Sequence, residues 1–371
     1  MSRSVNSTNA RLFAALDDYC MSGRAVVEGR DRTRRIWLSR YDYLVVENAV
    51  KVKAYHFGRY RSVSYWELKD TAYVATIGFD SDLQLADSGP IDLTSAMFLL
   101  LAAEMGPRPR ESATYVANLI GADRSGNSPV DKDGLALSEL FPRFQCVQLR
   151  HKISEPDVER AFISALSDEA EVSGSWMEEG LRRKLVTLAR SVPTMMPTGP
   201  LVEVLLDQDP RSLFMVLYRY LEGVYAYKAS SDLRAELKVD ASWIELARSL
   251  AGSLKWRPRE FEALTHVLNM SSAESVAKLG WSLGIEGDAT AERTAHPLYE
   301  MRNRLVHYSL GDARILPEHL NWNDLCAALC SVIESVYNVI ALQMLESAEA
   351  KLAISQADVD QASGGRWNRN A

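Results

Sequence analysis

Hydrophobic and polar positions change their spacing along the chain. Residues 8–21 carry apolar side chains at helical spacing, whereas residues 25–77 form short alternating or β-branched runs. Turn signals such as Phe57-Gly58 separate these runs and favour antiparallel hairpins. The predicted strands are Ala25–Glu28, Arg35–Leu38, Tyr43–Glu47, Val50–His56, Ser62–Trp66 and Ala72–Ile77.

Helical spacing dominates the remainder of the chain. Helices are predicted from Asp92 to Met105 and over Glu111–Ile120, and the pattern is helical from Pro156 almost to the end. The later segments are Asp157–Leu166, Trp176–Ser191, Pro210–Lys228, Ser231–Leu237, Ala241–Leu250, Pro258–Asn269, Ser271–Leu283, Pro297–Tyr308 and Trp322–Leu352. The sequence therefore predicts an α+β N-terminal region with antiparallel strands, followed by an all-α helical bundle, and a mostly helical protein.

Proline and glycine positions suggest how the chain is divided. The segment 193–200 contains three prolines and a glycine and is the clearest interruption. We expect an N-terminal recognition or sensor region at residues 1–150, a helical connector at 151–200 and an all-α domain at 201–355. Residues 356–371 end in a polar, glycine-containing stretch and are expected to form a disordered tail.

Charge is unevenly distributed over the 371 residues. Residues 1–70 carry 13 Lys/Arg and 8 Asp/Glu, whereas the rest carries 29 and 41, for a net charge of −7. A basic N-terminal segment on an acidic body is typical of a nucleic-acid partner, although docking of that segment onto the body explains the same asymmetry.

Several classes of protein are disfavoured. No run of about 18 apolar residues and no signal peptide is evident, so we expect no membrane association. The four cysteines lack a CxxC pair, which fits a reducing cytoplasm. Phosphate-binding glycine loops and metal spacings such as HExxH are absent from the sequence, so neither a cofactor nor a metal is expected.

The most specific chemistry lies in the six residues 302–307. They read Arg-Asn-Arg-Leu-Val-His, within a predicted helix. An imidazole with a pKa near neutrality can exchange a proton with a ribose 2′-hydroxyl, and a guanidinium can hold the oxygens of a phosphorane. Arg302, Asn303 and His307 are therefore candidate catalytic residues of a ribonuclease.

This motif and its surroundings resemble the HEPN superfamily of all-α domains. The likeness covers roughly residues 205–350: a long tyrosine-rich helix, a motif helix of the form Arg-Asn-x-x-x-His, and a following long helix. The resemblance implies metal-independent RNA cleavage that leaves a 2′,3′-cyclic phosphate and a 5′-hydroxyl. It also implies a homodimer through this domain and, by analogy, a role in anti-phage defence or toxin–antitoxin growth arrest.

Helix geometry bears on how the motif residues meet. Residues five apart in an α-helix are rotated by about 140°, so Arg302 and His307 do not share a face, whereas Asn303 and His307 do. The arginine and histidine can meet only if the helix ends near His307 or if a second subunit completes the site. The dimers of the family imply the second solution.

Other interpretations stay open. The domain is alternatively a catalytically inert dimerisation and partner-binding module, in which Arg302 and His307 cap carbonyls at a helix end. Arg219 and Glu222, three residues apart on an apolar helix, are interpreted first as a structural ion pair and second as an active-site wall. Arg304 and Tyr308 are weaker candidates for substrate contact.

The N-terminal region alternates cations and aromatic residues in its predicted strands. Such a sheet can bind single-stranded RNA, and the weak candidates for contact are Arg34, Arg35, Arg59 and Arg61. Ordinary sheet packing, with a protein-sensing or dimer-packing role, is the alternative. A protein or phage-derived molecule is a further candidate partner, as an activating trigger.

Overall fold

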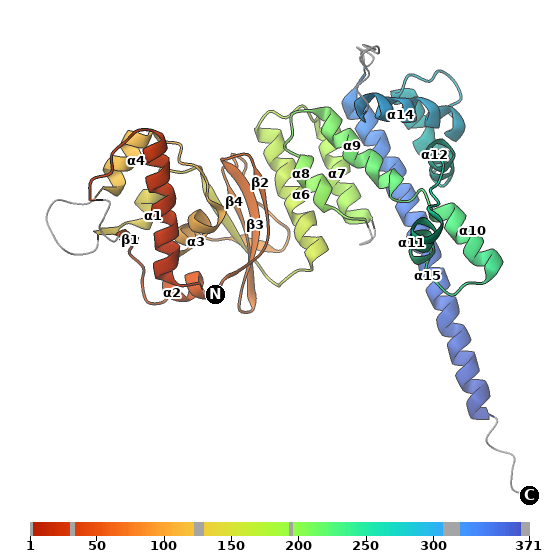
Figure 1. Ribbon diagram of the computed structural model, residues 1–371, viewed down its shortest axis with the longest axis horizontal. Coiled ribbons are helices and arrows are strands. Elements are labelled where there is room, and N and C mark those ends of the chain that lie inside the picture. The colour runs from red at the N-terminus through yellow and green to blue at the C-terminus, as the bar shows by residue number, and fades with distance from the viewer. Residues whose placement is uncertain (1–2, 30–33, 122–129, 193–195, 307–319, 365–371) are drawn as a thin grey trace, which may run out of the picture. The chain divides into compact units, whose positions relative to one another are not determined.

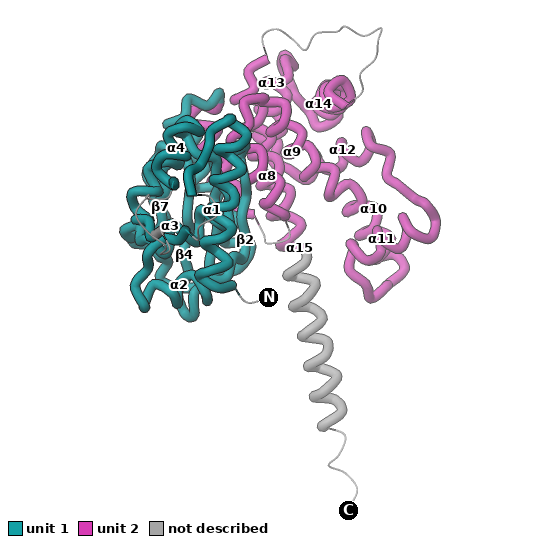
Figure 2. The backbone as a smooth tube through the Cα atoms, turned by 60° about the vertical axis from the view of Figure 1, so that its left-hand side comes forward, with its two compact units in different colours: residues 1–176 teal, residues 177–371 magenta. Residues whose placement is uncertain are grey.

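The computed structural model describes residues 3–29, 34–121, 130–192, 196–306 and 320–364. The chain divides into two compact units, residues 1–176 and 177–371 (Figure 2). The division lies inside the predicted connector, so that its first helix belongs to unit 1 and its second to unit 2.

Unit 1 combines helices with a β-sheet (Figure 1). Its helices are α1 (Val5–Ser22), α2 (Asp42–Asn48), α3 (Ser95–Met105), α4 (Ala113–Ile120), α5 (Gly134–Ser138) and α6 (Glu155–Val172). Its strands are β1 (Arg34–Ile36), β2 (Val50–Phe57), β3 (Arg61–Leu68), β4 (Thr71–Ile77), β5 (Ser88–Pro90), β6 (Val130–Lys132) and β7 (Phe144–Leu149).

The main sheet of unit 1 is antiparallel and has the strand order β2-β3-β4-β7-β5. Two hairpins join β2, β3 and β4, and β7 pairs with β4 after a long excursion, with Ala72 opposite Leu149. Strands β1 and β6 form a separate parallel pair, with Arg34 opposite Val130. The predicted α+β organisation with antiparallel strands is confirmed.

Both faces of the central strands are covered. Trp66, Ala75 and Cys146 belong to the core formed with α1, α3 and α4. The opposite face meets α6, where the rings of Tyr55 and Phe162 lie 5.9 Å apart. Because both faces are packed, β3 shows a run of buried residues instead of clean alternation.

A buried carboxylate attaches α6 to the sheet. Glu169 is fully buried, and its Oε2 accepts hydrogen bonds from the backbone N–H groups of Asp80 and Ser81, at 2.8 and 3.0 Å. Its Oε1 lies 3.2 Å from Nη2 of Arg61. The ion pair and the two backbone donors together offset the cost of removing this charge from water.

Unit 2 is helical, which confirms the predicted change of architecture. Its helices are α7 (Glu179–Ser191), α8 (Gly199–Val204), α9 (Pro210–Glu222), α10 (Tyr227–Leu237), α11 (Trp243–Leu254), α12 (Glu260–Asn269), α13 (Ala273–Ser282), α14 (Ala291–Val306) and α15 (Trp322–Gly364). Helix α15 packs against α7, α9, α12 and α13. Its side chains are fully buried at Leu325, Leu329, Ile333 and Val336, a helical spacing.

Helix α15 also contains an apolar stretch, Trp322–Gln343, that is long enough to cross a membrane. This is the single candidate span found among the described residues, and 56% of its most apolar window is buried inside the protein. The predicted absence of such a stretch therefore has this one exception. Its burial against neighbouring helices accounts for the apolar composition by packing.

Two of the predicted strands are wrong. Residues 43–47 lie in helix α2, where the carboxylate of Asp42 accepts hydrogen bonds from the N–H and hydroxyl groups of Ser39 and closes the first turn. Residues 25–28 form no strand, because Ala25 N–H bonds to the Cys20 carbonyl and the chain wraps around the end of α1.

Other boundaries also differ from the prediction. Strand β7 was missed, since Gln145 and Gln148 hide its apolar pattern, and the short strands β5 and β6 were missed with it. Helix α9 ends at Glu222 before Gly223, and α14 begins six residues before Pro297. Helix α15 runs to Gly364, past residue 356, where a disordered tail was expected.

Candidate functional site

The motif lies on helix α14. Its buried residues are Thr294, Ala295, Leu298 and Met301, which recur every three or four positions and form one apolar stripe. This stripe packs α14 against α12, α13 and α9. Arg302 and Asn303 follow directly after Met301, so packing of the stripe fixes where these two polar side chains lie.

Arg302 is held by a cluster of polar residues from three helices. Its Nη2 donates to Oε1 of Glu222 on α9 at 3.0 Å, and its Nη1 donates to Oδ1 of Asn303 at 2.9 Å. Oε2 of Glu260 on α12 lies 3.9 Å from Nη1. The guanidinium carbon is 6.0 Å from the ring centroid of Tyr218. These contacts give the arginine a defined position.

A hydrogen-bonded pair of tyrosines lies beside Arg302. The hydroxyl of Tyr225 donates to that of Tyr218 at 3.0 Å. Burial, chiefly, raises the pKa of Tyr218 to about 12, and burial likewise raises the pKa of Tyr225. Both phenols are therefore neutral at physiological pH and can act as hydrogen-bond donors or acceptors. We name Tyr218, Glu222, Tyr225, Glu260, Arg302 and Asn303 the Arg302 cluster.

The Arg302 cluster is locally acidic. Burial lowers the pKa of the Arg302 guanidinium, but the two carboxylates outweigh it, and the net shift is upward. One cation between two carboxylates leaves a net charge of −1. The Arg302 side chain is 18% exposed and that of Glu222 is 29% exposed. A phosphate can therefore reach the guanidinium only by competing with Glu222.

Arg219 and Glu222 do not pair with each other in the structure. Arg219 is exposed and makes no ion pair with any residue in the described part of the chain, whereas Glu222 pairs with Arg302. The interpretation of Arg219 and Glu222 as an ion pair is wrong, because the Glu222 carboxylate pairs with Arg302 on α14 instead. Arg304 is exposed and pairs with Glu300 at 3.2 Å, one turn earlier on the same helix.

His307 and Tyr308 lie outside the described residues. The prediction that Asn303 and His307 share a helix face involves His307 and therefore also lies outside the described residues. The structure thus brings together Arg302, Asn303 and Glu222 of the predicted site residues, and adds Tyr218, Tyr225 and Glu260. Sequence spacing gave no signal for Glu260, since α12 meets α14 only through the tertiary fold.

The four candidate arginines of unit 1 have different surroundings. Arg34 is buried and pairs with Asp17 at 2.5 Å, and Arg35 pairs with Asp131 at 2.6 Å. Arg61 pairs with Glu169 beneath the sheet. Arg59 is exposed in the β2–β3 turn, and its side chain makes no ion pair within the described residues. These positions do not gather into one free basic surface.

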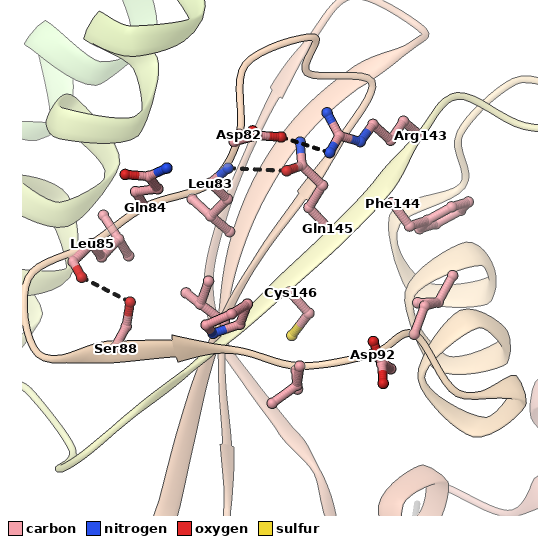
Figure 3. Close-up of a pocket in the computed structure, with 14 residues that line it drawn as sticks. Asp82, Leu83, Gln84, Leu85, Ser88, Asp92, Arg143, Phe144, Gln145 and Cys146 are labelled. Carbon is pink, nitrogen blue, oxygen red and sulfur yellow. Dashed lines mark hydrogen bonds and ion pairs between the residues drawn. The ribbon is translucent and has the colours of Figure 1, made fainter.

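An open cleft of about 600 Å³ lies in unit 1, beside β7 and the segment after β4. Asp82 and Arg143 pair at one edge of it at 2.7 Å, and Gln145 accepts from the Leu83 N–H at 3.0 Å (Figure 3). Gln145 Nε2 also donates to the Ser81 carbonyl at 2.7 Å. Arg143 and Gln145 on β7 thus hold the segment 81–83 in place.

No group of three or more His, Cys, Asp or Glu side chains suited to a metal ion occurs among the residues that the structure describes. Comparison of the chain with family models, with curated proteins and with solved structures found no match.

Proposed function

We propose that unit 2 is a HEPN-like, metal-independent endoribonuclease that acts as a homodimer. The observation that carries the proposal is the position of Arg302: a mostly buried guanidinium, fixed by Glu222 and adjacent to Asn303. Fixing a cation before substrate arrives avoids reorganisation at the moment when negative charge develops. Arg302 Nε is buried and has no hydrogen-bond partner among the described residues.

In this proposal each motif residue has one task. His307 takes the proton from the 2′-hydroxyl, the 2′-oxygen attacks phosphorus, and the bond from phosphorus to the 5′-oxygen breaks. A second imidazole, from the partner copy, protonates the 5′-oxygen as it leaves. Arg302 replaces its contact with Glu222 by contacts with the phosphorane oxygens, and Asn303 positions the phosphate. The products are a 2′,3′-cyclic phosphate and a 5′-hydroxyl.

The cellular role follows by analogy with the resemblance. An endoribonuclease of this kind fits anti-phage defence or toxin-like growth arrest in the cytoplasm. Unit 1 would then recognise an activating trigger. Three of its four candidate arginines, Arg34, Arg35 and Arg61, are ion-paired, which favours a sensor over an RNA platform, since a nucleic-acid surface requires cations that remain free to meet phosphates.

A second candidate function is an inert dimerisation and partner-binding module. The observation that favours it is the pair of carboxylates, Glu222 and Glu260, which surround Arg302 and make the cluster repel a phosphate. In such a module the Arg302 contacts would only join α14 to α9 and α12.

RNA cleavage distinguishes the two functions. Purified wild-type protein, Arg302→Ala and His307→Ala are incubated with total RNA in EDTA, and the ends of the products are mapped. Arg293→Ala is the matched control, because Arg293 is an exposed arginine on the same helix whose side chain donates to the carbonyls of Glu286 and Asp288 in the preceding loop.

The ribonuclease predicts cuts ending in cyclic phosphate from the wild type and Arg293→Ala, and none from the two motif variants. Intact RNA with all four proteins, each folded and dimeric by light scattering, would instead support the inert module. A monomeric wild type that cuts RNA would contradict the dimeric mechanism.

A further inference from the structure

Unit 1 contains an apolar cavity that none of the preceding functions uses. It has a volume of about 160 Å³ and lies between the sheet and helices α2 and α3. The side chains on the sheet side come from adjacent positions of three strands, because Trp66 pairs with Tyr73, Tyr73 with Gln148, and Ala75 with Cys146. The lining residues are Asp42, Val45, Ala49, Trp66, Leu68, Tyr73, Ala75, Ile91, Thr94, Met97, Leu100, Leu101, Cys146 and Gln148.

Small residues on opposite walls leave this space open. Ala75 on β4 and Ala49 after α2 are both buried, at 1% and 5% exposure, where larger apolar residues would fill the gap. Two contacts hold the Trp66 side chain in place on the wall formed by the sheet. The Trp66 indole N–H donates to Ser64 Oγ at 2.8 Å, and the Arg3 guanidinium lies 5.7 Å from the centroid of the Trp66 ring.

The cavity has an accessible side. Leu68, Tyr73, Ile91 and Met97 are only partly buried although they pack against the hydrophobic core. Core positions of this kind are normally covered completely, so their exposure marks an entrance. A cavity of about 150 Å³ lined by apolar groups stays dry and binds benzene in another protein, which sets the size of ligand that fits.

The polar groups of the cavity restrict the charge of the ligand. Burial raises the pKa of the Cys146 thiol to about 12, so this group is neutral. Asp42 accepts from Ser39, and Thr94 Oγ accepts from the Met97 N–H at 3.2 Å. Gln148 lines the cavity, is half-buried and has no side-chain hydrogen bond within the described residues. An anion would lie near the Asp42 carboxylate with no cation among the lining residues.

We propose that this cavity binds a small, uncharged molecule with an apolar body the size of a single aromatic ring and one hydrogen-bonding group directed to Gln148. Burial of the apolar body supplies the affinity, and the amide selects its orientation. The assignment is independent of the ribonuclease, because every lining residue belongs to unit 1.

The test uses the full chain and three probes: toluene, phenol and benzoate. Affinities are measured by isothermal titration and by ligand-observed NMR. The wild type should bind toluene and phenol, phenol more tightly, and should reject benzoate. Ala75→Leu fills the cavity and should weaken both neutral probes at least tenfold. Ala229→Leu, on an exposed position of α10, is the size-matched control and should bind as the wild type does.

Two further variants complete the test. Gln148→Leu should reduce phenol affinity to that of toluene or below, because the hydroxyl loses its partner, and should leave toluene unchanged. Ala49→Val fills the opposite wall and replaces Ala75→Leu if circular dichroism shows that the latter does not fold. Failure of the wild type to bind either neutral probe at millimolar concentration, equal binding by the filled variants, or binding of benzoate as tight as that of phenol would each overturn the assignment.

Discussion

Removing the charge of Glu222 should reveal what holds Arg302 in place. A hydrogen bond between ionised groups stabilises a protein by about 1.5–3 kcal/mol when buried. The Glu222 and Arg302 side chains are 29% and 18% exposed at a separation of 3.0 Å, so screening reduces the expected coupling to about 1–2 kcal/mol. Glu260, 3.9 Å away and 47% exposed, should contribute only about 0.2–0.5 kcal/mol.

A double-mutant cycle measures this coupling. Glu222→Gln, Arg302→Met and the double variant are unfolded in urea, and the interaction free energy is the deviation from additivity. Glu300→Gln and Arg304→Met form the control cycle on the same helix. That pair is exposed and four residues apart, and should couple by about 0.3–0.5 kcal/mol. A Glu222–Arg302 coupling no larger than the control value would refute the reasoning that the fold pre-positions Arg302.

The same variant also tests the acidic character of the site. Glu222→Gln keeps a hydrogen-bond acceptor but removes one negative charge, so an RNA fragment should bind about five-fold more tightly at low salt if its phosphate meets Arg302. The gain should disappear in Arg302→Met and decrease with added salt. Filter binding with a non-cleavable 2′-deoxy oligonucleotide measures it without interference from cleavage.

Three further predictions concern the fold. Gly78→Ala should destabilise the protein by about 2–4 kcal/mol in urea unfolding, because φ is +74° and a Cβ would lie 2.1 Å from the Tyr60 carbonyl oxygen. Gly58→Ala, at φ +69° with open space around it, should cost about 1–2 kcal/mol. Equal losses of stability in the two variants would contradict the clash at Gly78. Glu169→Leu should cost about 3–5 kcal/mol by leaving Arg61 and two backbone donors without their acceptor, and a loss below 1 kcal/mol on thermal unfolding would contradict that role. Burial raises the pKa of Glu334, but hydrogen bonds from Lys184 and Ser191 outweigh burial, and the net shift of this pKa is downward. The wild type should therefore lose stability relative to Glu334→Gln as the pH falls below about 4.5. Parallel pH profiles of the two proteins would refute this.

Local pattern predicted the organisation of this chain well where one periodicity acts over many residues. The helices of unit 2 are of this kind, since helical spacing reports directly on which face is buried. The hairpins of β2, β3 and β4 were predicted from short alternating or β-branched runs and from the turn signals between them. Strand β7 was not predicted because it is packed on both faces and carries two glutamines, so its sequence shows no apolar alternation. Helix α2 was not predicted because its short apolar run resembles a strand, and the Ser39–Asp42 hydrogen bonds that precede the helix cannot be seen in the pattern.

The candidate site was predictable only in part. Arg302 and Asn303 were found because they are consecutive and chemically distinctive. Glu222 was named, but Arg219 on the same helix was predicted to be its partner, since spacing along one helix was the only geometry available from sequence. Glu260 and Tyr218 join the Arg302 cluster through contacts between helices, which the linear pattern does not contain.

The late pairing of β4 with β7 has a consequence during synthesis. Ala72 leaves the ribosome long before Leu149, its opposite residue, and β1 likewise precedes its partner β6. Until β7 emerges, the nascent chain presents β4 as an unprotected sheet edge, which is the kind of edge that recruits other chains. Contacts between residues so distant in sequence also form slowly. Unit 1 is therefore the half of the protein in which a ribosomal pause or a truncation before residue 144 would produce aggregation.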